Sequence, residues 1–376
     1  MTSARKILFV TGTRADFGKM EPLAESARDA GFEVSFFVTG MHMMRKYGLT
    51  KTEVHRTKGF GVVEFINQRD SDPQDTILAK TIIGFSDFVV ETQPDLVVIH
   101  GDRVEATACA LTCATNYIRC AHVEGGEVSG TIDEVFRHCN TKLSTVHLVS
   151  SDIAAQRILR MGEPAQCVHV IGSPELDKHA QDSGVPLTEV KARYDISFDE
   201  YGIVVFHPVT SERAHIGAQA TALFGALEAS GRSMVVILPN NDPGTNDILE
   251  VIERLPPARF RPIPSMRFSY FSELMKNASA VIGNSSIGVR EAPFLGIPSL
   301  DLGTRQTKRS TAESITHCEA RDTAAIGAFL RDEWGQRYPS YSGFGLGAAA
   351  ATFQKLLRDD AFWALPLQKH FANDQD

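Results

Sequence analysis

The sequence predicts an α/β protein built from two Rossmann-like domains, each with a doubly wound parallel sheet. Short β-branched apolar runs alternate with amphipathic helical patterns, and the alternation restarts after a polar stretch at 181–199. Runs that are apolar throughout are typical of strands buried on both faces of a parallel sheet, and intervening helices give βαβ units. A length of 376 residues also suits two domains of ordinary size.

The expected elements follow this alternation along the chain. Strands of the first half are expected at 6–11, 33–38, 96–100, 119–123, 146–149 and 168–171, and those of the second half at 203–207, 234–238, 280–283 and 299–302. Helices are expected at 19–30, 73–92 and 152–161, with another that begins at Asp133. Terminal helices near 348–358 and 360–370 are too short to form a domain, so we expect them to pack back on one half.

Composition and charge narrow the classes of partner. Apolar residues make up 43% and charged residues 22%, as in ordinary globular proteins, and the net charge is -8. An acidic chain is a poor surface for nucleic acid or anionic membrane, and no stretch approaches the ~20 apolar residues of a membrane span. The six cysteines form no Cys-x-x-Cys pair and no export signal is recognisable. We therefore expect a cytoplasmic protein with small-molecule partners.

Polar clusters follow the predicted strands, where open α/β sheets bind their ligands. The loop TGTRADFG at 11–18 follows the first strand, HGDR at 100–103 and HVEGGE at 122–127 follow two later ones, and GNSS at 283–286 follows one in the second half. The first loop lacks the GxGxxG spacing of a dinucleotide site, so we expect no NAD. A tight turn with a helix cap is the plain alternative for this loop.

Three carboxylates suggest acid–base chemistry. Asp102 and Glu124 follow neighbouring predicted strands, and Asp133 begins a helix that carries Arg137, so all three can converge on one cleft. A single aspartate at a strand end is more often a cap, but three beside His100 and His122 favour proton transfer. Crowded carboxylates also raise one another's pKa values, which lets one act as acid while another acts as base.

The second half offers a phosphate site. In GNSSIGVREAP, Ser285, Ser286 and Gly288 are expected to open a helix whose free N–H groups suit a diphosphate, with Glu291 a turn later within reach of a ribose. A simple serine cap is the alternative. Arg305 and Arg309 are candidates to neutralise a pyrophosphate, although surface arginines are common after strands.

Two other chemistries compete for these residues. His122, Glu124 and Glu127 form the obvious candidate metal set, but no helical His-x-x-x-His or cysteine pair accompanies them, so we expect no metal. A serine hydrolase would need a GxSxG elbow, which the sequence lacks.

Taken together, the motifs resemble those of the hydrolysing UDP-N-acetylglucosamine 2-epimerases, which supply N-acetylmannosamine-type sugars for sialic or legionaminic acid synthesis. They are TGTRADFG, TGMHMMRKYG, HGDRVEA, HVEGGEVSGTIDEVFRH, GSPELD, FHPVTSE and GNSSIGVREAP, and the resemblance covers nearly the whole chain. HGDR and GGEVSGTIDE in particular are similar to the hydrolysing branch.

The resemblance implies a glycogen-phosphorylase-like (GT-B) arrangement with the active site in the cleft between domains at 1–172 and 173–349, and with 350–376 packing back on the first. It implies no cofactor, a UDP-sugar as ligand, and a homodimer or homotetramer. The catalytic residues would be Asp102, Glu124, Asp133, His207 and Arg137. Arg14 and Phe271 would flank the uracil, His42 would face the sugar hydroxyls, and Glu291 would bind the ribose. Further substrate-binding residues would be Arg103, Asn284, Ser285, Ser286, Gly288 and Arg305.

Three alternatives remain for the substrate and the reaction. The motifs TGMHMMRKYG and HGDRVEA resemble equally those of enzymes that act on UDP-2,4-diacetamido-2,4,6-trideoxyglucose, which shares the C2 acetamido chemistry. A GT-B glycosyltransferase would share the fold but needs an acceptor and no trio of carboxylates. A UDP-sugar sensor without activity is the third.

Overall fold

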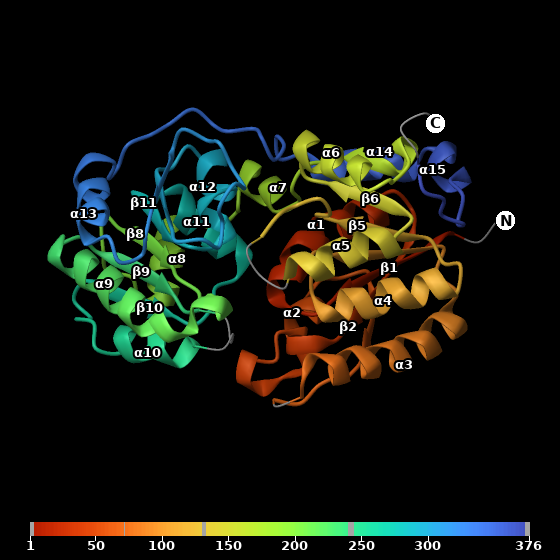
Figure 1. Cartoon of the computed structure of the whole chain (residues 1–376), viewed down its shortest axis with the longest axis horizontal. Coiled ribbons are helices and arrows are strands. Elements are labelled where there is room, and N and C mark those ends of the chain that lie inside the picture. Colours follow the sequence, from red (N-terminus) through yellow and green to blue (C-terminus); the bar gives the residue numbers. More distant parts are fainter. Residues whose placement is uncertain (1–3, 71, 130–132, 240–243, 373–376) are drawn as a thin grey trace. The chain divides into compact units, whose positions relative to one another are not determined.

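The computed structural model describes residues 4–70, 72–129, 133–239 and 244–372, which form two compact units (Figure 1). Of these residues, unit 1 comprises those up to Glu127, those from 133 to Asp177 and those from Gly345 onward. Unit 2 comprises the remainder, chiefly Lys178–Phe344. Within the described ranges, no helix is both long and apolar enough to span a membrane.

Unit 1 contains a parallel sheet with strand order β3-β2-β1-β4-β5-β6-β7. Its strands are β1 (Lys6–Thr11), β2 (Glu33–Val38), β3 (Gly61–Glu64), β4 (Leu96–His100), β5 (Cys120–Val123), β6 (Val146–Val149) and β7 (Val168–Val170). Its helices are α1 (Arg14–Asp29), α2 (Lys51–Arg56), α3 (Gln74–Thr92), α4 (Val104–Thr115), α5 (Asp133–Leu143), α6 (Asp152–Arg160), α14 (Ala349–Leu357) and α15 (Asp360–Ala364). Helix α7 (Glu175–Ala180) carries the chain on into unit 2.

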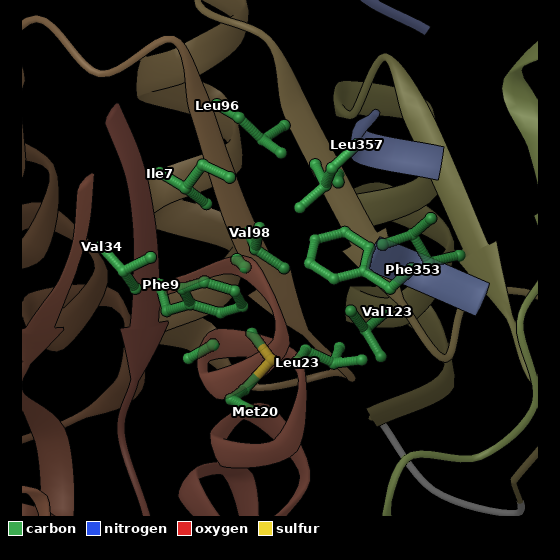
Figure 2. Close-up of a cluster of buried hydrophobic side chains, with 14 of the residues drawn as sticks. Ile7, Phe9, Met20, Leu23, Val34, Leu96, Val98, Val123, Phe353 and Leu357 are labelled. Atoms are coloured by element: carbon green, nitrogen blue, oxygen red, sulfur yellow. The ribbon is translucent and has the colours of Figure 1, made fainter. Parts of the chain in front are cut away.

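Helices cover both faces of this sheet, so alternate side chains of its central strands are buried in opposite layers. Ile7 and Phe9 of β1 pack in a cluster with α1 and with Phe353 and Leu357 of the C-terminal helix α14 (Figure 2). Leu8 and Val10 pack on the other face against α3 and α4. Each such fully buried side chain contributes about 1.5–3 kcal/mol. The C-terminal helix is therefore part of the core of unit 1.

Unit 2 repeats the plan with strand order β10-β9-β8-β11-β12-β13, again parallel. Its strands are β8 (Gly202–Val205), β9 (Met234–Ile237), β10 (Phe260–Ile263), β11 (Ala280–Gly283), β12 (Ser299–Leu302) and β13 (Ile315–Cys318). Its helices are α8 (Leu187–Tyr194), α9 (Ile216–Ala229), α10 (Thr245–Ile252), α11 (Phe268–Lys276), α12 (Glu291–Phe294) and α13 (Thr323–Asp332). Two apolar clusters cover the faces of this sheet, one with α9, α10 and α13 and one with α8, α11 and α12.

The expected fold class, two parallel-sheet α/β domains, is confirmed, but three helix boundaries were wrong. Helix α1 begins at Arg14 and not at residue 19, because the Thr13 side chain caps it. Helix α15 ends at Ala364 because Pro366 forces the preceding residue Leu365 into an extended conformation.

The third correction affects the candidate phosphate loop. The helix expected from residue 285 is a 3-10 turn, η5 (Ser286–Gly288), followed by the four-residue helix α12. A continuous helix would place the ring of Pro293 against the carbonyl of Val289, so the chain breaks between the two elements. Glu291 is consequently the first residue of α12 and does not lie a turn inside a helix.

Candidate active site

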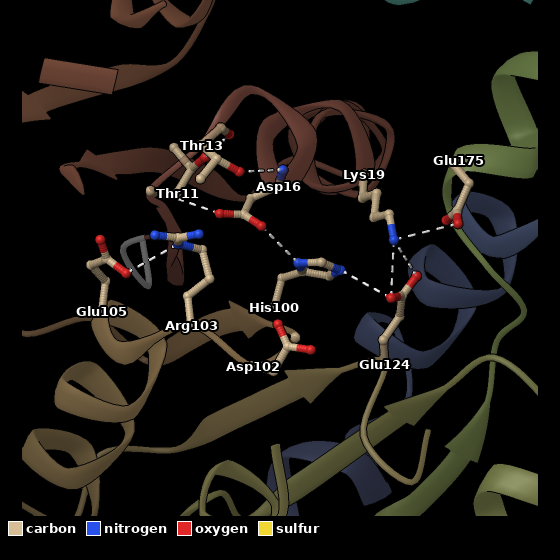
Figure 3. A network of polar contacts seen from close by, with 12 residues as sticks. Thr11, Thr13, Asp16, Lys19, His100, Asp102, Arg103, Glu105, Glu124 and Glu175 are labelled. Carbon is tan, nitrogen blue, oxygen red and sulfur yellow. Dashed lines mark hydrogen bonds and ion pairs between the residues drawn. The ribbon is translucent and has the colours of Figure 1, made fainter. Parts of the chain in front are cut away.

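The carboxyl ends of β1, β4 and β5 lie side by side, because these strands are neighbours in the sheet of unit 1. The loop after β1, residues 100–103 after β4 and residues 124–127 after β5 therefore meet at one edge. Figure 3 shows the polar side chains that gather there. The strand-end clusters found in the sequence are brought together as parallel pairing requires.

The loop after β1 is fixed by its own hydrogen bonds. The backbone N–H of Asp16 donates to Thr13 Oγ1 at 3.1 Å, and the N–H of Gly12 donates to Asp16 Oδ2 at 3.3 Å. The other oxygen of Asp16, Oδ1, lies 3.1 Å from His100 Nδ1. The first turn of α1 thus presents a carboxylate to the end of β4 and holds its histidine.

His100 lies between two carboxylates. Its Nδ1 faces Asp16, and its Nε2 is 3.2 Å from Glu124 Oε2. Burial by itself lowers the pKa of His100, but Glu124 and Asp16 outweigh it and raise the pKa above its ordinary value. Burial likewise raises the pKa of Asp16, but the hydrogen bond and charge of His100 hold that pKa at about 2. The arrangement favours an imidazolium between two carboxylates.

Glu124 combines a left-handed backbone conformation with a buried side chain that is paired with a lysine. Its φ is 63°, in the left-handed region that residues other than glycine rarely adopt, and its side chain is buried. Lys19 Nζ lies 2.9 and 3.0 Å from the two Glu124 oxygens and 3.4 Å from Glu175 Oε1. Ser173 Oγ donates toward Glu124 Oε1 at 3.3 Å and to Glu175 Oε2 at 2.9 Å. Two buried carboxylates therefore share one cation and one hydroxyl.

Helix α5 supports the turn after β4. Arg137, which is buried, forms an ion pair with Asp102 and donates to the carbonyl of Glu127 at 3.4 Å. Asn140, also on α5, donates to the carbonyl of Gly101 at 3.0 Å. Asp133 is the first residue of α5, one turn before Arg137 and thus on the same helix face.

The candidate metal ligands His122, Glu124 and Glu127 contact other protein groups. His122 is fully buried, with Nε2 2.7 Å from the carbonyl of Gly101 and Nδ1 3.2 Å from Thr141 Oγ1, and burial lowers its pKa to about 3. The carboxylate of Glu127 accepts a hydrogen bond from Ser150. Across the described residues, no group of three or more His, Cys, Asp or Glu side chains is arranged to hold a metal ion. His122 therefore fixes the turn at Gly101 as a neutral imidazole.

Three residues expected at the ligand have protein partners in unit 1. Arg14 makes a two-pronged ion pair with Glu53, with Nε 2.7 Å from Oε2. Arg103 Nε donates to Glu105 Oε2 at 3.3 Å. His42 is fully buried between the hydroxyls of Thr11 at 2.9 Å and Thr50 at 2.8 Å, and burial lowers its pKa to about 4.

Both ring nitrogens of His42 thus have protein partners, and these contacts hold the loop after β1 against the segment that follows β2. A contact between His42 and the sugar stays a prediction.

In unit 2 the neighbouring strands β8 and β11 bring His207 and Asn284 together. Asn284 accepts from the His207 N–H at 2.7 Å and donates to the His207 carbonyl at 2.8 Å. Its own carbonyl accepts from Arg305 Nη1 at 3.1 Å and from Gln306 at 3.0 Å. Burial, with a smaller effect of the Arg305 charge, lowers the pKa of His207 to about 3. Asn284 thus ties His207 to Arg305.

Backbone geometry fixes the loop that carries the two serines. Gly283 has φ 140°, and a Cβ there would collide with the carbonyl oxygen of Val205. A Cβ at Gly288 would lie 2.8 Å from Ser299 Oγ, so a larger residue here would require the Ser299 side chain to move. Ser285 precedes η5, but its side chain makes no capping hydrogen bond, so the simple-cap alternative is wrong.

Glu291 and Phe271 complete the set predicted for unit 2. Glu291 is buried, and its Oε1 lies 3.1 Å from His179 Nε2. Phe271, on α11, is half-buried and packs against the apolar cluster that covers this face of the sheet.

The sequence profile of the UDP-N-acetylglucosamine 2-epimerases matches residues 24–358, which is most of the chain. The chain belongs to this family.

Two curated relatives align over nearly the full length. A UDP-N-acetylglucosamine 2-epimerase of Neisseria meningitidis serogroup B is 40% identical over 378 residues, covering 98% of each chain. A UDP-N,N'-diacetylbacillosamine 2-epimerase (hydrolyzing) of Legionella pneumophila is 31% identical over 377 residues, again covering 98% of each.

Solved structures of the family share the fold. The UDP-GlcNAc 2-epimerase from Neisseria meningitidis bound to UDP-GlcNAc superposes with a TM-score of 0.78 at 19% identity, covering 94% of this chain and 100% of that one. The Methanocaldococcus jannaschii enzyme in complex with UDP-GlcNAc and UDP gives 0.77 at 18% identity, covering 94% and 99%. The architecture is therefore of the GT-B-like type.

Sequence reasoning missed four residues of these clusters, namely Lys19, Ser173, Glu175 and His179. Lys19 had a signal, since it lies three residues after Asp16 and thus on the same face of α1. The other three lie in SPELDKH, where Ser173 and Glu175 contact each other; the Ser173–Glu124 and His179–Glu291 contacts join distant parts of the chain and could not be predicted from the local sequence.

Proposed function

We propose that the chain is a hydrolysing UDP-N-acetylglucosamine 2-epimerase, which converts UDP-N-acetylglucosamine and water into UDP and N-acetylmannosamine. The observation that carries this proposal is the arrangement of Asp102 and Glu124 at one sheet edge of a family member, each paired with a cation from a helix. Carboxylates in such a setting can exchange protons with carbon, and proton exchange at C2 is what inversion of that centre requires.

The proposed reaction has two steps. In the first, a carboxylate removes the C2 proton, the C2–H electron pair forms the C1=C2 double bond, and the C1–O electron pair leaves with UDP. In the second, another carboxyl group, in its protonated form, donates its proton to C2 from the opposite face while water adds its hydroxyl to C1 and passes its proton to the carboxylate so formed. The first carboxyl group then releases the abstracted proton to solvent, so the products are UDP, a proton and a free sugar inverted at C2, and the enzyme recovers its initial protonation.

We assign proton transfer to Asp102, Glu124 and Asp133. Lys19 and Arg137 support this assignment, because a nearby cation stabilises the ionised form that a base needs. The His100 imidazolium, beside both Asp16 and Glu124, adds a second positive charge that orients Glu124. No NAD or metal is required, since the steps are proton transfers and an elimination.

We assign the nucleotide to unit 2. His207, Ser285, Ser286 and Arg305 would hold the diphosphate, and a neutral imidazole can still donate an N–H to a phosphate oxygen. Donors already placed where charge builds on the leaving group lower the barrier to C1–O cleavage. Glu291 would accept hydrogen bonds from the ribose.

The uracil is assigned to Phe271 of unit 2, which the resemblance names for it.

The choice of sugar rests on the relatives. Identity of 40% to a UDP-N-acetylglucosamine 2-epimerase, against 31% to a UDP-N,N'-diacetylbacillosamine 2-epimerase, favours UDP-N-acetylglucosamine. The hydrolysing outcome is supported by the motifs HGDR and GGEVSGTIDE. We further propose a cytoplasmic homodimer or homotetramer whose product feeds sialic or legionaminic acid synthesis. A 27% identical relative is a polysialic acid biosynthesis protein of Escherichia coli.

Product analysis tests the proposal. The purified protein is incubated with UDP-N-acetylglucosamine and no acceptor, and nucleotides and sugars are separated by chromatography. We expect free UDP and N-acetylmannosamine in equal amounts. Accumulation of UDP-N-acetylmannosamine would make the enzyme non-hydrolysing, and no turnover without an added acceptor would favour a glycosyltransferase. Faster turnover of UDP-2,4-diacetamido-2,4,6-trideoxyglucose in a parallel reaction would replace the proposed substrate.

A further inference from the structure

A buried histidine in unit 2 connects a serine to the candidate ribose carboxylate. His179 lies in α7, and its side chain is fully buried. Its Nε2 is 3.1 Å from Glu291 Oε1, and its Nδ1 is 2.9 Å from Ser272 Oγ of α11. Both ring nitrogens therefore have partners, and the three residues form one line of hydrogen bonds.

The surroundings of His179 fix the orientation of its ring. The ring of Phe268, on the first turn of α11, lies with its centroid 5.1 Å away at an interplanar angle of 54°. Ser272, one turn further along α11, is itself fully buried. Since α7, α11 and the first residue of α12 all contribute, no one of these elements alone sets the position of the Glu291 carboxylate.

A polar line of this kind is a poor way to stabilise a core. Desolvation of a buried histidine–carboxylate pair offsets much of its attraction, and well-packed apolar residues often serve stability as well or better. What the line does provide is a fixed orientation, because each hydrogen bond has a narrow preferred geometry. An ionised carboxylate has about four acceptor positions, so the bond from His179 leaves acceptor capacity for a ligand.

We propose that His179, itself held by Ser272, is a positioning residue that aims the Glu291 carboxylate at the ribose diol of the nucleotide and so sets the preference for ribonucleotides. This inference rests on the proposed function, which assigns Glu291 to the ribose. In the tautomer that carries its proton on Nε2, His179 donates to Glu291 and accepts at Nδ1 from the Ser272 hydroxyl. The carboxylate then accepts from the two ribose hydroxyls.

The test compares UDP with 2′,3′-dideoxy-UDP, which lacks both hydroxyls, by titration calorimetry on the full-length protein. The wild-type protein should prefer UDP by at least roughly 10-fold, since a hydrogen bond to a charged group contributes about one tenfold step or more. His179→Phe, which removes both nitrogens but keeps an aromatic ring beside Phe268, should weaken UDP to within about 3-fold of the dideoxy ligand. The affinity for the dideoxy ligand should stay unchanged.

Three further variants separate orientation from stability. Glu291→Gln shows how much of the preference for UDP over the dideoxy ligand depends on the carboxylate. His179→Gln, whose amide N–H can reach that carboxylate, should keep part of this preference. Ser272→Ala should give an intermediate loss and covers the case in which His179→Phe does not fold.

The matched control is His147→Phe in unit 1, which removes a similarly buried pair in which His147 Nε2 lies 2.9 Å from Glu163 Oε2. It should lower stability and leave the preference for UDP intact.

The outcomes separate this inference from the function on which it rests. Equal weakening of both ligands in His179→Phe, or full retention of the preference, overturns the positioning role. Wild-type protein that binds UDP and makes product, yet does not distinguish the dideoxy ligand, overturns the ribose assignment alone. Wild-type protein that neither binds UDP nor releases it from UDP-N-acetylglucosamine refutes the proposed function.

Discussion

Removing the amino group of Lys19 should destabilise unit 1 and disable the candidate active site. Lys19 Nζ lies 2.9 Å from Glu124 and 3.4 Å from Glu175, whose side chains are only 8% and 2% exposed. In Lys19→Met both carboxylates stay buried and lose their shared cation. Breaking a buried pair by removing one partner costs about 3–5 kcal/mol. Because Lys19 is 16% exposed and water can partly replace it, we expect the lower value, about 3 kcal/mol.

A second substitution distinguishes charge from packing. Glu175→Gln added to Lys19→Met removes one of the two carboxylates that have lost the lysine, so we expect it to recover at least about 1 kcal/mol. The same change alone should be destabilising, because it takes a carboxylate away from Lys19. Turnover should not recover in the double variant, since Glu124 still lacks its lysine.

The assay can report on unit 1 alone. The chain has two tryptophans, Trp334 in unit 2 and Trp363 in unit 1, where Trp363 stacks on Phe32 with centroids 5.9 Å apart. In a Trp334→Phe background, urea denaturation followed by fluorescence measures the unfolding of unit 1. A loss of under 1 kcal/mol in Lys19→Met, or a double variant no more stable than the single one, would refute the reasoning.

The remaining predictions concern turnover, acidity and metal ions. Asp102→Asn, Glu124→Gln and Asp133→Asn should each lower kcat by at least ~10²-fold with UDP affinity retained, because an amide cannot exchange a proton at neutral pH; a decrease under threefold would remove that residue from the mechanism. Burial lowers the pKa of His122 and of His207 in the folded protein to about 3, from an ordinary value near 6.5. Between these two values the unfolded chain binds more protons than the folded one, so the free energy of unfolding falls as the pH drops from about 6.5 toward 3. Between pH 7 and pH 5 each of the two histidines should lower the free energy of unfolding by about 2 kcal/mol. In urea denaturation, His122→Gln should remove the part of this pH dependence that His122 contributes. An unchanged pH dependence in this variant would contradict the view that His122 is buried as a neutral imidazole. EDTA should leave turnover intact because lysine and arginine supply the positive charge, whereas loss restored by one divalent ion would revive the metal hypothesis.

The interior of the fold could be predicted from the sequence more accurately than its edges. Strands β1, β2, β4, β6, β11 and β12 have the expected bounds, because each is an apolar run between polar turns. The edge strands β3, β10 and β13 were not expected. Each has partly exposed residues, and β10 contains Pro262, which only an edge position tolerates in a sheet. Strands of four residues with burial this incomplete show neither a continuous apolar run nor a clear alternation of apolar and polar residues.

In the candidate site, too, some features could be predicted from the sequence and others could not. Asp102 and Glu124 could be predicted to meet because their strands are neighbours in a parallel sheet. The partners that orient them could not, since the Lys19–Glu124 pair spans 105 residues and the His179–Glu291 pair 112. The two threonine partners of His42, which is predicted to face the sugar, could not be predicted from the sequence either. A residue type at a plausible position does not show which way its side chain is already bonded.

Solvent deuterium tests the central claim, elimination followed by protonation at C2, most directly. The reaction is run in heavy water with UDP-N-acetylglucosamine, and the sugar released with UDP is analysed by mass spectrometry and by the NMR signal of the C2 proton. Because C2 is reprotonated by a carboxylate that exchanges with solvent, the account predicts N-acetylmannosamine carrying one deuterium at C2. N-acetylmannosamine that retains the original hydrogen at C2 would contradict it.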